Sequence, residues 1–142
     1  MSDIEDIRRL LADYCFGTDS GDTERWVACF TDDVVWDGGA FGRFEGKAAA
    51  RAYHQGAGDA ALNYRHINTN HVIAVDGDRA AVQSYVLLLD QSGSALAIAF
   101  SGFYDDALVR DGGCWRIRSR RLLPDARLLE QGMMRTADFR KA

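Results

Sequence analysis

Apolar positions in the first part of the chain recur with the spacing of a helix. Between residues 3 and 17, side chains such as Ile7 and Leu11 follow one another at intervals of three or four residues, which predicts an amphipathic helix. Shorter runs of the same kind predict helices over residues 23–31 and 47–55. The N-terminal part of the chain is therefore expected to supply most of the helices.

From about residue 61 onward the pattern changes to β-compatible residues with little helical periodicity. Long strands are predicted over residues 61–75, 79–90, 95–110 and 115–123, and a short strand at 33–37 with a hairpin partner at 41–45. Short turns rich in glycine, aspartate and serine join the long strands, which makes neighbouring strands antiparallel. Helices followed by a strand meander indicate an α+β fold. We expect a cone-shaped, curved antiparallel sheet with the N-terminal helices packed over it, enclosing a pocket.

Length and composition fit one small globular domain. The chain has 142 residues, of which 47% are hydrophobic and 27% charged, and the net charge is −4. We therefore expect a single domain over residues 1–142, with about 125–142 as a C-terminal tail. The acidic balance argues against a nucleic-acid or membrane partner. The alternation in the last strand predicts that Arg116, Arg118, Arg120 and Arg121 form its solvent face.

Cysteine usage and the N-terminal residues bear on compartment and cofactors. Cys15, Cys29 and Cys114 are odd in number and lack the spacing of metal ligands, so we expect them to be reduced and mostly buried. The N-terminus is charged, and no apolar run approaches the length of a membrane span. These features predict a cytoplasmic protein. No metal is expected, and no glycine-rich nucleotide fingerprint indicates a cofactor.

Polar side chains follow one face of the first long strand. Because strand residues alternate between faces, Tyr64, His66, Asn68 and Asn70 are predicted to point the same way. On a half-buried strand such a row needs hydrogen-bond partners or a wet cavity, so it predicts either a polar pocket wall or a solvated sheet face. Asp19, after the first helix, is by its position alone an ordinary turn residue.

Four segments in this order resemble the SnoaL-like family of the nuclear-transport-factor-2-like superfamily. They are Tyr14-x4-Asp19-x2-Asp22, Trp26-x3-Phe30-Thr31-Asp32-Asp33-Val34, Arg65-His66-x-x-Thr69-Asn70, and Tyr104 followed by Gly113-x-Trp115-Arg116-Ile117. Lyases of that superfamily, including scytalone dehydratase, hexachlorocyclohexane dehydrochlorinase and bile acid 7α-dehydratase, use a histidine–aspartate dyad at the matching places. The resemblance therefore implies that His66 and Asp19 form a catalytic dyad.

A catalytic dyad requires further residues that form a substrate pocket. Tyr14 and Tyr104 are expected to donate hydrogen bonds to an oxygen of the substrate, and Asn70 either makes a polar contact or is simply a residue of the sheet edge. Apolar walls are expected from Trp36, Tyr53, Leu89 and Phe100, with plain core packing as the alternative for each aromatic residue. The chain departs from the lyases at three places. Gly38 stands where scytalone dehydratase has a tyrosine, no histidine stands near Leu89–Gln91 where that enzyme has a second one, and Ser20 stands where the dehydrochlorinase has a lysine.

Two functions follow as alternatives. In the first, His66 abstracts a proton from carbon in a hydrophobic, cyclic substrate, so that a hydroxyl or halide leaves or a double bond moves. In the second, the cone is a non-catalytic binding or assembly module, like the small subunit of ring-hydroxylating dioxygenases. The expected partners are a small hydrophobic ligand and further copies of the chain, in a homodimer or homotrimer. The reaction type and the substrate stay open.

Overall fold

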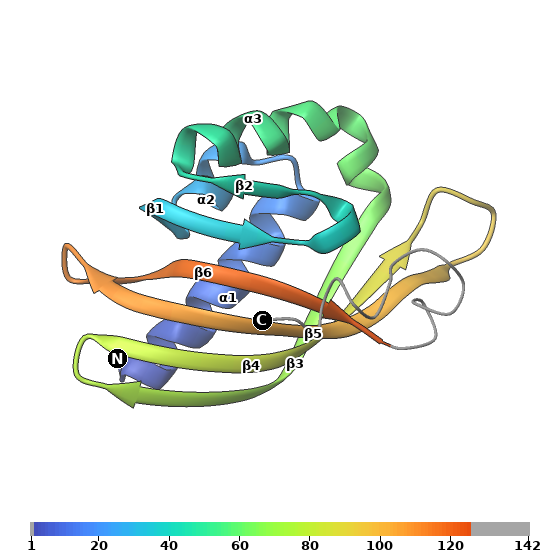
Figure 1. Ribbon diagram of the computed structural model, residues 1–142. Helices are drawn as coiled ribbons and strands as arrows, with labels where there is room; N and C mark the ends of the chain where they lie inside the picture. The colour runs from blue at the N-terminus through green and yellow to red at the C-terminus, as the bar shows by residue number, and fades with distance from the viewer. Residues whose placement is uncertain (1, 126–142) are drawn as a thin grey trace.

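The computed structural model describes residues 2–125 and consists of three helices and a curved, unclosed sheet (Figure 1). The helices are α1 (Asp3–Asp19), α2 (Thr23–Val27) and α3 (Lys47–Ala57), with two 3₁₀ turns at Gly39–Phe41 and Gly58–Asn63. The strands are β1 (Phe30–Asp37), β2 (Arg43–Glu45), β3 (Tyr64–Asp76), β4 (Arg79–Asp90), β5 (Ala97–Asp111) and β6 (Cys114–Pro124). The predicted α+β class is confirmed. The predicted tail lies outside the described residues except for Asp125.

The strands form one mixed sheet in the order β2-β1-β6-β5-β4-β3. The meander from β3 to β6 is antiparallel, as predicted, and so is the β1–β2 hairpin. However, β1 and β6 run parallel, so the expectation of a wholly antiparallel sheet is wrong at this one pairing. A parallel pair needs a long crossover, which α3 and strands β3 to β5 supply. The sheet curves around α1, which crosses one of its faces (Figure 1).

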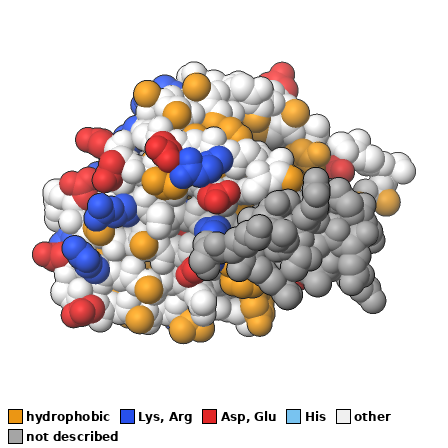
Figure 2. All heavy atoms as spheres, in the orientation of Figure 1, with side chains coloured by type: hydrophobic (Ala, Val, Ile, Leu, Met, Phe, Trp, Pro, Cys, Tyr) orange, Lys and Arg blue, Asp and Glu red, His pale blue; other side chains and the backbone are white. Residues whose placement is uncertain are grey.

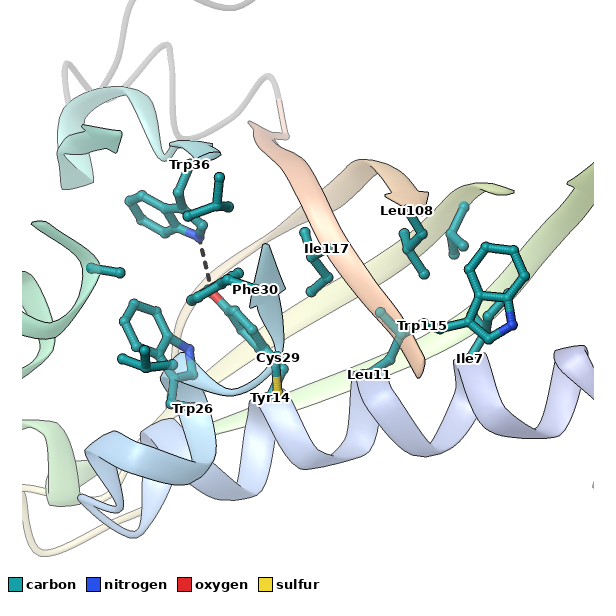
Figure 3. Packing of buried hydrophobic residues seen from close by; sticks show 14 of the residues in the cluster. Ile7, Leu11, Tyr14, Trp26, Cys29, Phe30, Trp36, Leu108, Trp115 and Ile117 are labelled. Carbon is teal, nitrogen blue, oxygen red and sulfur yellow. Dashed lines mark hydrogen bonds between the residues drawn. The ribbon is translucent and has the colours of Figure 1, made fainter. Parts of the chain in front are cut away.

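Helix α1 forms because its cap and its apolar stripe agree. The Ser2 side chain accepts a hydrogen bond from the backbone N–H of Glu5 and so caps the first turn. Ile7, Leu11 and Tyr14 are at most 2% exposed and point into the core against β6 (Figure 3). The C-terminal end of α1, at Asp19, reaches the start of β3, where the site lies.

The second helix is shorter than predicted. It ends at Val27, and Phe30 already belongs to β1, where it pairs with Ile117 of β6. The predicted helix 23–31 was therefore too long by one turn. Trp26, Val27 and Phe30 are all buried, and a short apolar run of this kind fits a helix or a strand equally well.

A β-bulge interrupts the alternation of β3. The pairing with β4 shifts between Thr69 and Val72, and Asn70 adopts the left-handed conformation at φ 57°. As a result the side chain of Asn70 faces solvent and that of His71 is partly buried, which is the reverse of what strict alternation predicts. The expected polar row is therefore correct for Tyr64, His66 and Asn68 but wrong for Asn70.

The face of the sheet that α1 leaves open carries scattered apolar side chains, while acidic and basic side chains gather toward the end of the β5–β6 hairpin (Figure 2). Val72, Tyr85 and Ile98 are each more than 60% exposed. Within residues 2–125, no helix has the length and apolarity needed to cross a membrane.

The cysteines differ in burial. Cys15 and Cys29 are buried, and burial raises the pKa of the first thiol to about 11 and of the second to about 12, so both are inert thiols. Cys114 is exposed at the start of β6, so two of the three cysteines are buried. Its neighbours in the β5–β6 turn are glycines, which offer nothing to cover it.

We predict that Gly17→Ala destabilises the protein although alanine favours helices. An added Cβ at Gly17 would lie 2.7 Å from the backbone nitrogen of Trp26, so α1 and α2 would have to move apart. We expect the free energy of unfolding to fall by about 1–3 kcal/mol, measured by urea unfolding. The control is Gly56→Ala in α3, where no atom lies within 4 Å of the new Cβ. There we expect a gain of up to about 1 kcal/mol. Equal effects at both positions would contradict this account.

Candidate active site

His66 and Asp19 lie in direct contact at the C-terminal end of α1. Asp19 is the last residue of the helix, and its Oδ1 lies 2.6 Å from Nδ1 of His66. Its other oxygen, Oδ2, accepts a hydrogen bond of 2.8 Å from the backbone N–H of His66. One carboxylate thus fixes both the strand and the ring. The expected proximity of the two side chains is found, and their catalytic role stays a prediction.

This contact sets the tautomer of the imidazole. A carboxylate only accepts hydrogen bonds, so Nδ1 of His66 carries the proton that points to Asp19. In the neutral ring Nε2 is then the free acceptor, and no hydrogen bond to it is found within residues 2–125. The side chains of His66 and Asp19 are 18% and 12% exposed, so water screens the pair only partly. The arrangement suits a general base.

His66 lines a cavity of about 360 Å³ inside the cone, which we call the aromatic cavity. Its lining contains the aromatic residues Tyr14, Trp26, Trp36, Phe41, Tyr53, Tyr64, Phe100 and Tyr104. Leu88 and Leu122 add apolar surface, and Thr18, His54 and His66 add polar groups. No lysine, arginine, aspartate or glutamate of the described chain lines it. The size falls in the range of small-molecule sites.

Asp19 lies outside the aromatic cavity. It lines instead an open groove of about 450 Å³ between α1 and β3, together with Arg8, Phe16 and His71. His66 is the residue that both spaces share. The dyad therefore lies between the two spaces, since His66 borders both and Asp19 borders the groove alone.

Two phenols of the cavity are available as hydrogen-bond donors. The indole N–H of Trp36 donates to the Tyr14 hydroxyl over 3.0 Å, which leaves the hydroxyl proton of Tyr14 free to donate elsewhere (Figure 3). The ring of Tyr14 meets those of His66 and Tyr104 edge to face, with centroids 6.4 and 6.2 Å away. Burial raises the pKa of both tyrosines. They consequently stay protonated at neutral pH.

A buried ion pair packs against the rings of these two tyrosines. Arg120 donates two hydrogen bonds, of 2.8 and 2.7 Å, to the carboxylate of Asp106, and both side chains are fully buried. The guanidinium carbon lies 4.1 Å from the ring centroid of Tyr14 and 3.8 Å from that of Tyr104. Burial opposes the charge, but the charge and hydrogen bonds of Asp106 outweigh it and hold the pKa of Arg120 above its ordinary value.

The expectation that Arg120 faces solvent is therefore wrong. A register shift between Ala107 and Leu108 of β5, opposite Arg118, breaks the alternation of β6. The inward positions change from Ile117 to Arg120, and Arg118 stays outside. Asp106 was the available signal, because an acid on the inner face of a central strand requires a buried cation.

Most residues predicted for the pocket lie in the aromatic cavity. They are Tyr14, Trp36, Tyr53, His66, Phe100 and Tyr104. Asn70 does not, because the bulge turns it outward. Leu89 does not line the cavity either; Leu88 takes its place, pairing with His66 and Phe100. In the run Leu87–Leu89 no polar residue marks which face is buried, so a shift of one residue is easily made.

The other two histidines have separate positions. His54 of α3 lines the aromatic cavity and is 6% exposed, and sequence reasoning missed it. His71 lies in the α1–β3 groove, where its Nε2 contacts the side-chain oxygen of Asn68 at 3.0 Å. Across the part of the chain that the structure describes, no three His, Cys, Asp or Glu side chains are grouped so that they could hold a metal ion.

The fold and the site define a class: a small α+β domain whose curved sheet encloses an aromatic cavity with a histidine–aspartate pair at its wall. The model of the SnoaL-like domain matches residues 1–121. The chain therefore belongs to the SnoaL-like family, within the cystatin-like, nuclear-transport-factor-2-like folds.

Solved structures agree with this assignment. The protein Rv3472 of Mycobacterium tuberculosis, of unknown function, is 33% identical, with TM-score 0.79 over 86% of this chain and 76% of that one. A Nostoc punctiforme protein of unknown function with a cystatin-like fold is 27% identical, with TM-score 0.78 over 87% and 91%. A protein of Novosphingobium aromaticivorans, provisionally classed as a scytalone dehydratase, is 24% identical, with TM-score 0.72 over 86% and 83%, and shows the fold alone. No curated protein matches the chain.

Proposed function

We propose that this SnoaL-like protein is a cofactor-independent enzyme in which His66 removes a proton from carbon in a neutral, hydrophobic, cyclic substrate. One observation carries the proposal: the Nδ1 of His66 is held by Asp19 at 2.6 Å while the same ring lines the aromatic cavity. A base fixed in this way presents Nε2 to a bound molecule. Proton transfer by a positioned base contributes roughly 10²–10⁴-fold to a rate.

The lining of the cavity supports a neutral and apolar substrate. Aromatic rings dominate it, and no lysine, arginine, aspartate or glutamate among the described residues offers a charge to a ligand. An ionic substrate would lose its hydration without a counter-charge, which is costly. Flat rings are instead well accommodated between aromatic side chains.

The proposed step is the removal of a proton from carbon with formation of a double bond. Nε2 of His66 takes the proton, and the electron pair of the broken C–H bond forms a double bond. In a lyase the pair expels a halide ion or a hydroxyl group from the neighbouring carbon; the imidazolium then gives its proton to the hydroxyl group, which leaves as water, or to solvent after loss of a halide. In an isomerase the imidazolium returns the proton to another carbon. Tyr14 and Tyr104 donate hydrogen bonds to the oxygen that gains negative charge, and Asp19 stabilises the imidazolium.

A turnover screen tests the proposal. Wild-type protein is assayed on cyclic hydroxy ketones, enones and halogenated rings, with absorbance and halide release as readouts. We expect at least one compound to turn over, and His66→Ala to reduce its rate roughly 10²–10⁴-fold. His71→Ala is the matched control, since that histidine lies in the groove and not in the cavity. Turnover that survives His66→Ala would rule out the base.

The second candidate is a non-catalytic module of an assembly. The observation that favours it is the exposed apolar side chains of the open sheet face, including Val72, Tyr85 and Ile98. In that case the cavity only holds a ligand, or the sheet face pairs with further copies of the chain in a homodimer or homotrimer. Such a role would survive the loss of His66 or Asp19, whereas an enzyme would not.

A further inference from the structure

His54 attaches α3 to the connection between α1 and α2. Its Nδ1 lies 2.8 Å from the hydroxyl oxygen of Thr23, the first residue of α2. Its ring stacks on that of Trp26, with centroids 4.9 Å apart and planes 27° from parallel. The side chain is only 6% exposed, so this contact is shielded from water.

The connection that His54 holds is the one that carries Asp19. The backbone N–H of Asp22 donates to the carbonyl of Gly17 over 3.0 Å, which closes the turn after α1. Gly17 also packs directly on the backbone of Trp26, where an added Cβ would come within 2.7 Å. The end of α1, the turn and the start of α2 therefore form one tightly packed unit. His54 of α3 contacts this unit at Thr23, and the Asp19 carboxylate connects the same unit to β3 at His66.

The surroundings of His54 favour a positional role over a chemical one. Its Nε2 is buried, and no hydrogen-bond partner for it is found in residues 2–125. A shielded atom of this kind is not reached by a ligand in the cavity. Burial lowers the pKa of His54, and the nearby Thr18 carbonyl and the charge of Asp22 only oppose this shift. The ring is therefore neutral at neutral pH. It is attached to α2 by stacking on Trp26 and by the hydrogen bond with Thr23.

We infer that His54 is a positioning residue, which keeps the turn after α1 in place so that the Asp19 carboxylate meets both the ring and the backbone of His66. The inference rests on the proposed function, because it concerns the same dyad. Both hydrogen bonds of Asp19 must form together, and a shift of the turn by a fraction of an ångström weakens at least one of them. By keeping the turn in place, His54 therefore helps to keep the proton of the His66 ring on Nδ1.

NMR spectroscopy of the full-length protein tests the positional role without a substrate. The readout is the imidazole proton between Nδ1 of His66 and Asp19, and its rate of exchange with water. We expect His54→Phe, which keeps a ring on Trp26 but loses the hydrogen bond, to speed this exchange roughly tenfold. Thr23→Val, which removes the hydroxyl alone, should act in the same direction. His71→Gln is the control and should leave the signal unchanged.

Kinetics on a compound from the turnover screen supply the second readout. His54→Phe should lower kcat roughly tenfold with a smaller change in KM, because phenylalanine keeps an aromatic ring in the cavity lining and only the hydrogen bond to Thr23 is lost. In an Asp19→Asn background the same change should have no further effect, since both act through one contact.

The inference is overturned if the His66 proton signal is unaltered in both His54→Phe and Thr23→Val while Asp19→Asn abolishes it. It is also overturned if His54→Phe and Asp19→Asn lower kcat independently. Absence of turnover in the wild type would instead refute the proposed function, and the NMR result would then decide the inference by itself. A purely structural role of His54 would change the free energy of unfolding and leave the exchange rate unaltered.

Discussion

Replacing Asp19 by asparagine is expected to lower kcat roughly 10²–10⁴-fold on any substrate of His66, with a much smaller change in KM. The carboxylate accepts two hydrogen bonds from His66, one from the backbone N–H and one from Nδ1. An amide side chain offers a single acceptor oxygen, so one of the two donors must face an NH₂ group. The backbone N–H cannot change, so the ring shifts its proton to Nε2.

With the proton on Nε2, the nitrogen that faces the substrate is no longer a base. Steady-state kinetics of Asp19→Asn measure this loss, and the NMR signal of the His66 ring proton reports the tautomer directly. Asp22→Asn is the matched control, because Asp22 caps α2 by accepting from the Arg25 backbone N–H and does not touch His66. Asparagine caps helices as well as aspartate does. Equal activity of the Asp19 variant and this control would remove the dyad from the mechanism.

Removing Asp106 is expected to be the most destabilising change near the site. Arg120 would stay fully buried with its charge uncompensated, which typically costs about 3–5 kcal/mol. We therefore expect Asp106→Ala to lower the free energy of unfolding by about that amount, measured by urea unfolding. The neighbouring Asp105→Asn is the control. Its partner Arg121 lies 3.7 Å away and both side chains are partly exposed, so the expected loss is at most about 1 kcal/mol.

The double variant Asp106→Leu/Arg120→Met separates the charge from the packing. With both charged groups replaced by apolar ones of similar size, most of the lost stability should return. The part of the stability that does not return measures the contact of the guanidinium with the rings of Tyr14 and Tyr104, about 2 kcal/mol at most. A double variant as unstable as Asp106→Ala would contradict the view that the unpaired charge is the main cost.

Local patterns were enough to predict most elements of the fold. The helix from Asp3 and the strand at Arg79–Asp90 agree closely with the patterns, since each has caps or turns at its ends and a clear period between them. The helix at Thr23 was predicted too long, because its last apolar residues fit either structure. The parallel pairing of β1 with β6 joins segments about eighty-five residues apart, and no local pattern specifies such a contact.

The candidate site was predictable where alternation holds and unpredictable where it breaks. His66 and Tyr104 point inward as their strands require. Asn70 and Arg120 lie beyond irregularities in β3 and between β5 and β6, which reverse the facing of every residue that follows. The position of His54 depended on how α3 packs on α2, which the helical pattern leaves open.

Spacing and residue type along the chain were sufficient to predict the α+β class, the order of helices and strands, and the pairing of His66 with Asp19 by resemblance. Three further features follow only from the packed fold. The carboxylate of Asp19 binds both the ring and the backbone of His66, Arg120 is buried against two tyrosines, and His54 contacts the start of α2. Each of these depends on distances of a few ångströms between segments remote in sequence, and such distances are fixed only when the sheet, its bulges and the helices pack together.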